Sequence, residues 1–477
     1  MFNSAKTLAP VVAAIVLLGG CATNPRASLP NVESELGSRT DAKVAWPITD
    51  EDRAKTDTAV QALLAAELTV ESAVQIALLN NRTLRATFEE LGLSQAGLVE
   101  AGRVPNPSLS FYVRWPHDAP RGPHWEFNLT EDVLGAAMLP ARQRMARDEV
   151  VRAERRVAHE VIALVADVKA ASFSYLAQRQ LRERLGVIGG VNDASADLAQ
   201  RQFDAGNINR LELLQLQTAA QQSKLDLARA DAELRVARER LNRLLGLQGE
   251  QTKWNLDGAL ANPPAVEPDF DRLEELVVSE RLDLAAARAE VSFAEAALKL
   301  KRNTRYLPAS INLGGTAERE SNGAKSHGPS LEMQLPIFDQ GQADVMRLES
   351  LWRQSRDRAE ALEVEIRSEV RSARDALLAA RSAAEYFATV LLPQRKQILR
   401  ETLLHYNAMQ KSSYELLAAK AEEQFAQRES IEALRDYWIA RAELERAIGG
   451  KLSGGTPMTA PAAEEMPAEE PAHQHHH

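Results

Sequence analysis

A short segment occurs twice in this chain, and the spacing of its copies constrains the fold more than any other feature. The first copy covers residues 203–219 and reads FDAGNINRLELLQLQTA. The second covers residues 406–422 and reads YNAMQKSSYELLAAKAE. Matching positions lie 203 residues apart, and the same offset links Leu245-Gly246 to Ile448-Gly449. The chain is therefore expected to contain one structural unit twice, with its helices and turns in register.

Composition favours long helices and excludes some classes of function. Only 5% of the 477 residues are aromatic, and the chain is rich in Ala, Leu, Glu, Arg and Gln, which suits long helices packed through small side chains. The net charge of −10, with both signs interspersed, argues against a nucleic-acid-binding protein, which would show a basic patch. We find no catalytic constellation and no phosphate-binding loop in the sequence, so an enzyme is not expected.

The first twenty residues have the pattern of a signal peptide. Lys6 supplies positive charge, and the apolar run from Leu8 to Leu18 is shorter than the ~20 residues of a membrane-spanning helix. The run ends in Leu18-Gly19-Gly20-Cys21, and Cys21 is the only cysteine, so an intrachain disulfide is impossible. A cleaved signal peptide with an incidental cysteine is the alternative.

Each copy of the unit is predicted to contain a helix, a β-hairpin, a very long helix and a further helix. The prolines between residues 22 and 68 suggest an extended segment before the first copy. Pro393, in the second long helix, matches Gly190 of the first long helix in the repeat. The glycines of the first long helix mark either a break or a bend in it. The predicted ranges are 69–103, 109–115, 125–130, 140–204 and 209–245, then 270–303, 311–316, 331–335, 342–407 and 412–448.

The predicted strands alternate between apolar and polar residues, which gives each hairpin one apolar face. Four strands cannot close a barrel, and an open sheet edge cannot stand in lipid, so membrane strands require several chains. Two chains give eight strands around a filled interior, and three give twelve around an aqueous lumen. A small soluble sheet with one buried face remains the alternative. The residues predicted to face lipid are Leu109, Phe111, Val113, Trp115, Trp125, Phe127, Leu129, Ile311, Leu313, Leu331, Met333 and Leu335, and those predicted to face water are Ser110, Arg114, Glu126, Asn128, Asn312, Glu332 and Gln334.

Several motifs in this order resemble the TolC-type outer membrane factors, the outer membrane efflux lipoprotein family. They are LGGC at Cys21, NRTLRA and RLDLAA in the first helices, PNPSLSF and LPASIN before the strands, LPIFDQGQA after the second hairpin, and the two turns. The resemblance implies a mainly α fold whose helical hairpins form a periplasmic α-barrel. It also implies that four strands per chain join a trimeric, 12-stranded transmembrane β-barrel. The domains are expected at 1–20 (signal peptide), 21–67 (lipid-anchored extended segment), 68–247 (first repeat), 248–269 (connector), 270–450 (second repeat) and 451–477 (disordered tail).

The resemblance also implies a function and partners. It predicts a passive exit duct in a tripartite efflux pump, joined by a periplasmic adaptor and an inner-membrane transporter, most simply of the resistance-nodulation-division type. Lipidation at Cys21, followed by Ala22, implies the outer membrane. A structural periplasmic coiled-coil lipoprotein or an adaptor without a pore is the alternative function. Apart from the covalent lipid no cofactor is expected, although imidazoles at the C-terminal end of the chain have the chemistry to bind copper or zinc: His473, His475, His476 and His477.

The two turns would form the periplasmic tip, where the adaptor docks and the duct closes. Glu212 and Glu415 would together form a ring of carboxylates that favours cations. Both are alternatively solvated acids in the first turn of a helix, stabilised by its dipole. Met409 replaces the glycine of the first turn, and methionine is costly where φ is positive. The expected docking residues are Gly206, Asn207, Ile208, Asn209, Arg210 and Leu211 in the first turn, and Gln410, Lys411, Ser412, Ser413 and Tyr414 in the second.

Overall fold

The computed structural model describes residues 24–117, 122–268, 270 and 273–452. These residues form two compact units, which we describe separately. The first unit contains residues up to 32 together with 89–154 and 286–357, and the second contains 33–88, 155–285 and the residues from 358 onward. Several helices run through both units, so their bounds are given for the whole helix.

The internal repeat seen in the sequence is present in the helices. Helix α7 (Leu139–Asp204) has 66 residues, and its counterpart consists of α11 (Gln342–Tyr386), a π-turn (Phe387–Leu391) and α12 (Leu392–Asn407). Helices α8 (Arg210–Leu245) and α13 (Ser413–Ile448) have 36 residues each. Every matching bound differs by the 203 positions found in the sequence, which confirms that one unit occurs twice. The glycines of α7 do not interrupt it.

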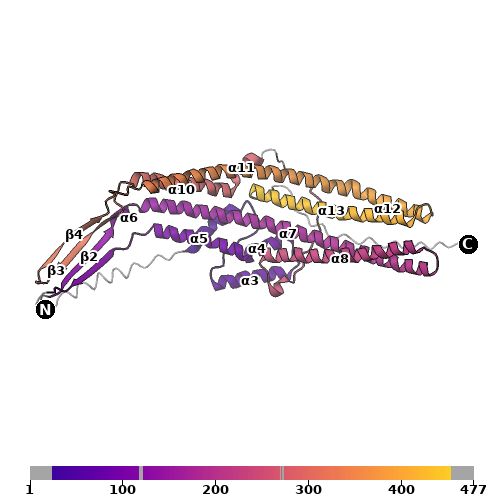
Figure 1. The fold of residues 1–477 in the computed structure, drawn as a ribbon, viewed down its shortest axis with the longest axis horizontal. Coiled ribbons are helices and arrows are strands. Elements are labelled where there is room, and N and C mark those ends of the chain that lie inside the picture. The colour runs from indigo at the N-terminus through magenta and orange to yellow at the C-terminus, as the bar shows by residue number, and fades with distance from the viewer. Residues whose placement is uncertain (1–23, 118–121, 269, 271–272, 453–477) are drawn as a thin grey trace. The chain divides into compact units, whose positions relative to one another are not determined.

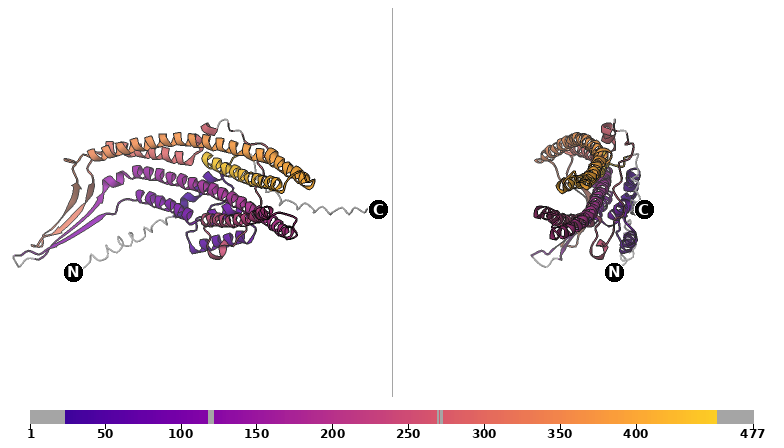
Figure 2. Two further views of the ribbon diagram at one scale, coloured as in Figure 1. Left: turned by 45° about the vertical axis from the view of Figure 1, so that its right-hand side comes forward. Right: turned by 90° about the vertical axis from the view of Figure 1, so that its right-hand side faces the viewer.

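Each copy ends its last helix in the same way. Gly246 after α8 has φ 68°, and Gly449 after α13 has φ 76°, so both adopt the left-handed conformation that glycine tolerates without a Cβ clash. In the second unit, α8 runs beside the later part of α7, and α13 runs beside α12 (Figures 1 and 2). Within the described residues, no helix combines the length and apolar character needed to cross a bilayer.

The first helix of each copy is broken, where a single helix was expected. The structure has α4 (Val70–Asn80) and α5 (Arg82–Ala101), then α9 (Leu273–Glu280) and α10 (Leu282–Thr304). At the first break, Asn81 accepts a hydrogen bond from the Leu84 amide (2.9 Å) and donates to the Leu244 carbonyl (2.8 Å). At the second break, Arg281 donates to the Ala447 carbonyl (2.7 Å). Asn81 thus caps the start of α5, and both side chains also bind a carbonyl in the last turn of the final helix of their copy.

The segment before the first copy was expected to be extended, but its described part is largely helical. It contains a 3-10 turn (η1, Pro25–Ser28), α2 (Leu29–Leu36) and α3 (Asp50–Ala65). Pro30 occupies the second position of α2, where its missing N–H has no helical acceptor to lose. Thr49 begins α3 with a capping box shared with Asp52.

The first unit contains one antiparallel sheet with its strands in chain order. The strands are β1 (Ser108–Arg114), β2 (His124–Asp132), β3 (Ile311–Arg319) and β4 (Lys325–Met333), and a short helix, α6 (Val133–Ala137), follows β2. The predicted strand 331–335 left Gly328 and Pro329 in the loop before it, but both lie within β4. Proline is tolerated there because β4 is an edge strand, where a missing N–H need not break a ladder.

One face of the sheet is apolar, and the described residues leave its side chains exposed. Leu109 pairs with Leu129 and Phe111 with Phe127, and the exposed fractions of these four side chains lie between 47% and 69%. The rings of Phe111 and Phe127 lie 4.5 Å apart between centroids. Leu313, opposite Leu331 on the next pair of strands, is also exposed. The predicted alternation is therefore confirmed, and among the described residues no core covers the apolar face.

Candidate functional site

The turn between α7 and α8 closes with two hydrogen bonds that run back into α7. The Gly206 amide donates to the Phe203 carbonyl (2.9 Å), and the Asn207 amide donates to the Gln202 carbonyl (2.8 Å). Gly206 has φ 74°, which this helix ending requires. The chain can then start α8 within a few residues.

The turn between α12 and α13 has the same geometry although it lacks the glycine. The Met409 amide donates to the Tyr406 carbonyl and the Gln410 amide donates to the His405 carbonyl, both at 2.9 Å. Met409 has φ 59°, and it is the one non-glycine residue with positive φ in the described part of the chain. Its side chain is 95% exposed. The substitution therefore keeps the turn and adds backbone strain.

Both helices that follow the turns begin with a side-chain cap. Asn209 accepts a hydrogen bond from the Glu212 amide (2.9 Å), and Ser412 accepts one from the Glu415 amide (3.2 Å). In the second turn the Glu415 carboxylate also accepts the Ser412 amide (3.0 Å), which completes a capping box.

The two candidate constriction residues differ in their surroundings. Lys411 donates to the Glu415 carboxylate (2.5 Å), and this bond together with Ser412 lowers the pKa of Glu415 to about 2. The Glu415 carboxylate is thus held by its own turn, as expected for an acid in the first turn of a helix. Within the described residues, the Glu212 carboxylate has no ion-pair or hydrogen-bond partner. Ile208 replaces Lys411 at the matching position.

A groove begins beside the two turns and runs between α8 and α13. Its volume is about 570 Å³. The walls consist of pairs that match in the repeat, Leu211 with Tyr414 and Leu214 with Leu417. The side chains of Leu211 and Tyr414 are 66% and 65% exposed, so the groove opens at the turns. The structure therefore brings residues from both predicted tip segments to the mouth of one groove.

Two polar side chains that line this groove, Asn192 and Lys420, are hydrogen-bonded to each other, and Asn192 also contacts Ser223. The Lys420 ammonium on α13 donates to the Asn192 side-chain oxygen on α7 (2.9 Å), and the Asn192 amide donates to the Ser223 hydroxyl on α8 (2.5 Å). Burial lowers the pKa of Lys420. The contact between Lys420 and Asn192, which we call the floor contact, joins α13 of the second helical hairpin to α7 of the first.

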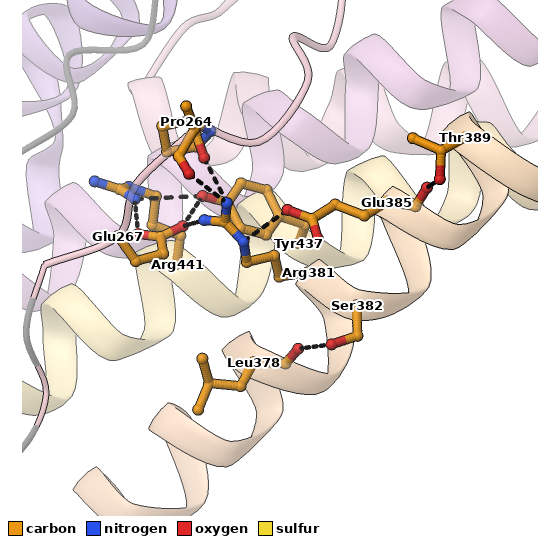
Figure 3. Close-up of polar contacts among 10 residues, drawn as sticks. Pro264, Glu267, Leu378, Arg381, Ser382, Glu385, Thr389, Tyr437 and Arg441 are labelled. Atoms are coloured by element: carbon orange, nitrogen blue, oxygen red, sulfur yellow. Dashed lines mark hydrogen bonds and ion pairs between the residues drawn. The ribbon is translucent and has the colours of Figure 1, made fainter.

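Sequence reasoning missed a buried polar cluster that holds the connector against the second copy (Figure 3). The Glu267 carboxylate accepts hydrogen bonds from Arg381 (3.0 Å), Arg441 (2.7 Å) and Tyr437. Glu267 and the two arginines are 5% to 16% exposed, so water screens these charges little. Burial, together with the adjoining Glu267, raises the pKa of Tyr437. No local pattern in the sequence marks such long-range contacts.

The polar face of the sheet carries opposed charges. Glu126 lies directly opposite Glu318 on the neighbouring strand. Arg114 lies 3.5 Å from the Glu126 carboxylate, and the His124 ring lies 2.9 Å from the Glu318 carboxylate. The Arg114 contact offsets part of the repulsion between the two carboxylates placed opposite one another.

Two groups of predicted site residues lie outside the described part of the chain. They are Cys21 at one end and His473, His475, His476 and His477 at the other. Within the described ranges, no group of three or more histidine, cysteine or acidic side chains is arranged to hold a metal ion.

Comparison with known proteins gives a consistent picture. The family described as "Outer membrane efflux protein" matches residues 127–247. The chain is 25% identical over 393 residues to the cobalt-zinc-cadmium resistance protein CzcC of Cupriavidus metallidurans, covering 81% of this chain and 91% of the relative.

Solved structures match the fold at lower sequence identity. The Campylobacter jejuni CmeC outer membrane channel gives a TM-score of 0.70 at 16% identity, over 88% of this chain and 93% of that one. CusC gives 0.68 at 19% identity, over 80% and 92%. Together with the family match, they confirm the resemblance drawn from the sequence motifs.

Proposed function

We propose that this chain, a TolC-type outer membrane factor by its motifs, family match and fold, is the passive exit duct of a tripartite efflux pump. The observation that carries the proposal is the sheet. In the described part of the chain it has an exposed apolar face, a polar face and two unpaired edge strands, β1 and β4. Such a sheet satisfies its edges in lipid only by joining copies of itself into a closed barrel.

Three chains form the duct in this proposal, because three copies of the sheet give twelve strands and an aqueous lumen. The outward face then carries the apolar pairs, with Phe111 beside Phe127. The inward face carries polar residues, among them Asn128 and Ser330, whose side chains are hydrogen-bonded (3.1 Å). The rival, a coiled-coil lipoprotein without a pore, leaves this apolar face unexplained.

The two turns and the groove between them are the proposed docking site of the periplasmic adaptor. The exposed Leu211 and Tyr414 suit an apolar helix side chain, and Arg210 and Lys411 suit acidic ones. Glu212 and Glu415 lie in the first turns of α8 and α13, and they border the proposed constriction. Because Lys411 neutralises part of the charge of Glu415, Glu212 is the stronger determinant of cation preference.

The remaining parts of the assembly follow from the same proposal. The chain is exported by residues 1–20, lipidated at Cys21 and held in the outer membrane. An inner-membrane transporter, of the resistance-nodulation-division type, supplies the energy. The resistance to cobalt, zinc and cadmium named for the relative CzcC favours metal ions as cargo, and the histidine tail has suitable chemistry.

The test is the susceptibility of a deletion strain to cobalt, zinc, cadmium, copper and silver salts beside drugs and detergents. Complementation uses the full-length chain and a version that ends at Pro471. We expect metal sensitivity, rescued by the full-length chain. Rescue by both versions would make the tail dispensable, whereas drug sensitivity without metal sensitivity would contradict the metal cargo. No sensitivity to any compound would contradict the efflux function.

A further inference from the structure

Arginines from both copies of the repeat hold the connector. Arg179 on α7 donates to the carbonyls of Leu256 and Gly258. Arg381 on α11 donates to the carbonyls of Pro264 (2.7 Å) and Ala265 (3.2 Å). Arg179 and Arg381 differ by one position in the repeat, so both long helices are held at the same level.

A second pair of arginines repeats the arrangement on the shorter helices. Arg238 on α8 donates to the Thr252 carbonyl (3.2 Å), and its guanidinium lies 4.6 Å from the centroid of the Trp254 ring. Arg441 on α13, 203 positions later, binds Glu267 (2.7 Å). We call residues 252–267 with these four arginines the connector belt. The belt thus attaches four helices, α7, α8, α11 and α13, to one connecting segment.

The second long helix is weakened directly beyond the belt, on the side of the turns. At the π-turn Phe387–Leu391, the Leu392 amide bonds to the Phe387 carbonyl, five residues back. Pro393 follows and has no N–H to continue the helical ladder. Thr389 returns a hydroxyl hydrogen bond to the Glu385 carbonyl (2.7 Å), a contact that bends helices (Figure 3).

The first long helix is weakened at the matching level by different residues. Gly186, Gly189 and Gly190 lie within α7, and Gly190 matches Pro393 in the repeat. Apart from the backbone of α7 itself, a Cβ atom at any of the three would meet no atom of the described chain within 4 Å, so contacts within the chain do not require glycine there. Glycine lowers the resistance of a helix to bending because it has the greatest backbone freedom.

We propose that residues 186–190 and 387–393 form a flexure at which the helical hairpins bend, while the connector belt keeps the parts behind it fixed. The parts beyond the flexure carry both turns, the groove and the floor contact between Lys420 and Asn192. A partner that occupies the groove can therefore move the turns without disturbing the belt. The role of this bending in opening rests on the proposed function, but the bending itself does not.

Spin-label distances measure the bending within one chain. One pair, Leu198→Cys with Leu403→Cys, spans the two hairpins beyond the flexure. The other, Glu160→Cys with Val364→Cys, spans α7 and α11 behind the belt. Full-length labelled protein is reconstituted in lipid nanodiscs with excess unlabelled chain, and a sample without introduced cysteines controls for Cys21.

We expect the distance distribution beyond the flexure to be at least twice as broad as the one behind the belt. Pro393→Ala and Gly190→Ala should each narrow it by a third or more and leave the other pair unchanged. Gly97→Ala, in α5, has the same chemistry and an equally open Cβ position, and Pro140→Ala matches the proline. Neither control should change either distribution.

Equal widths for the two pairs, or widths that do not respond to Pro393→Ala and Gly190→Ala, would overturn the flexure. Ion conductance of the same samples in planar bilayers is recorded separately. Absence of conductance in every sample would contradict the proposed function, whereas the distance distributions would still decide the flexure. Variants with both narrowed distance distributions and fewer channel-opening events would link bending at the flexure to opening.

Discussion

Single residues differ between the two copies while the backbone does not. Met409 has the left-handed conformation that Gly206 has in the first turn. A side chain in this conformation costs roughly 1–2 kcal/mol. The second turn is therefore the more strained of the two, although its hydrogen bonds match those of the first.

Met409→Gly should relieve this strain and stabilise the second turn by about 1 kcal/mol, since the side chain is exposed and loses no packing. Hydrogen exchange of the amides of residues 405–412 measures the effect as slower exchange. Gly206→Met is the mirror substitution and should speed exchange in the first turn. Faster exchange in Met409→Gly would contradict the strain.

The second turn should also depend on pH in a way that the first does not. Lys411 and Ser412 lower the pKa of Glu415 from 4.5 to about 2, so the carboxylate stabilises the turn most where it is ionised. This stabilisation is complete above about pH 4.5 and is lost as the pH falls through about 2. Exchange in the second turn relative to the first, corrected for intrinsic rates, should rise between pH 4.5 and 2. In Glu415→Gln that rise should be absent, and a rise of equal size in the variant would refute the assignment.

At the scale of elements, local patterns predict most of the fold and long-range polar contacts account for the rest. The 203-residue offset and the alternation of the strands predict the repeat, the long helices and the hairpins. The breaks at Asn81 and Arg281 escape prediction because their hydrogen bonds go to distant carbonyls. The helices between residues 29 and 65 were not predicted, because a proline in the sequence is compatible both with the start of a helix and with an extended segment.

The candidate site is predictable to a smaller extent. The register of the repeat identifies the two turns, the acidic residues of the first helical turn behind each, and Leu211 and Tyr414 at the mouth of the groove. The floor contact of Lys420 and the cluster around Glu267 depend on which helices meet, and the sequence alone does not contain that information. The difference in surroundings between Glu415 and Glu212 depends on a single exposed side chain, that of Lys411.

The cluster around Glu267 should contribute strongly to the stability of the second unit. Glu267→Gln removes the buried carboxylate that Arg381 and Arg441 share, and leaves Arg381 with the half-exposed Glu385. Breaking a buried ion pair on one side costs about 3–5 kcal/mol, so a clear fall in the thermal unfolding midpoint is expected. Glu385→Gln removes a half-exposed partner of Arg381 and should cost less than about 1 kcal/mol. Equal midpoints for the two variants would contradict the role of the cluster.

At the scale of the whole molecule, the account depends on what covers the apolar face of the sheet. Phe127 and Asn128 are neighbours on β2 whose side chains point to opposite faces. If the apolar face lies in lipid, a charge on it costs about 2–4 kcal/mol near the bilayer midplane, and a charge facing the lumen costs little. The matched substitutions are Phe127→Lys and Asn128→Lys.

The most direct test of the exit duct is the single-channel current of the purified full-length chain in planar bilayers, recorded for the unsubstituted protein and both variants. The account predicts cation-preferring current steps from heat-modifiable trimers of the unsubstituted protein and of Asn128→Lys. It predicts neither trimers nor steps from Phe127→Lys. Folded trimers of the unsubstituted protein that carry no current, or equal currents from Phe127→Lys, would contradict it.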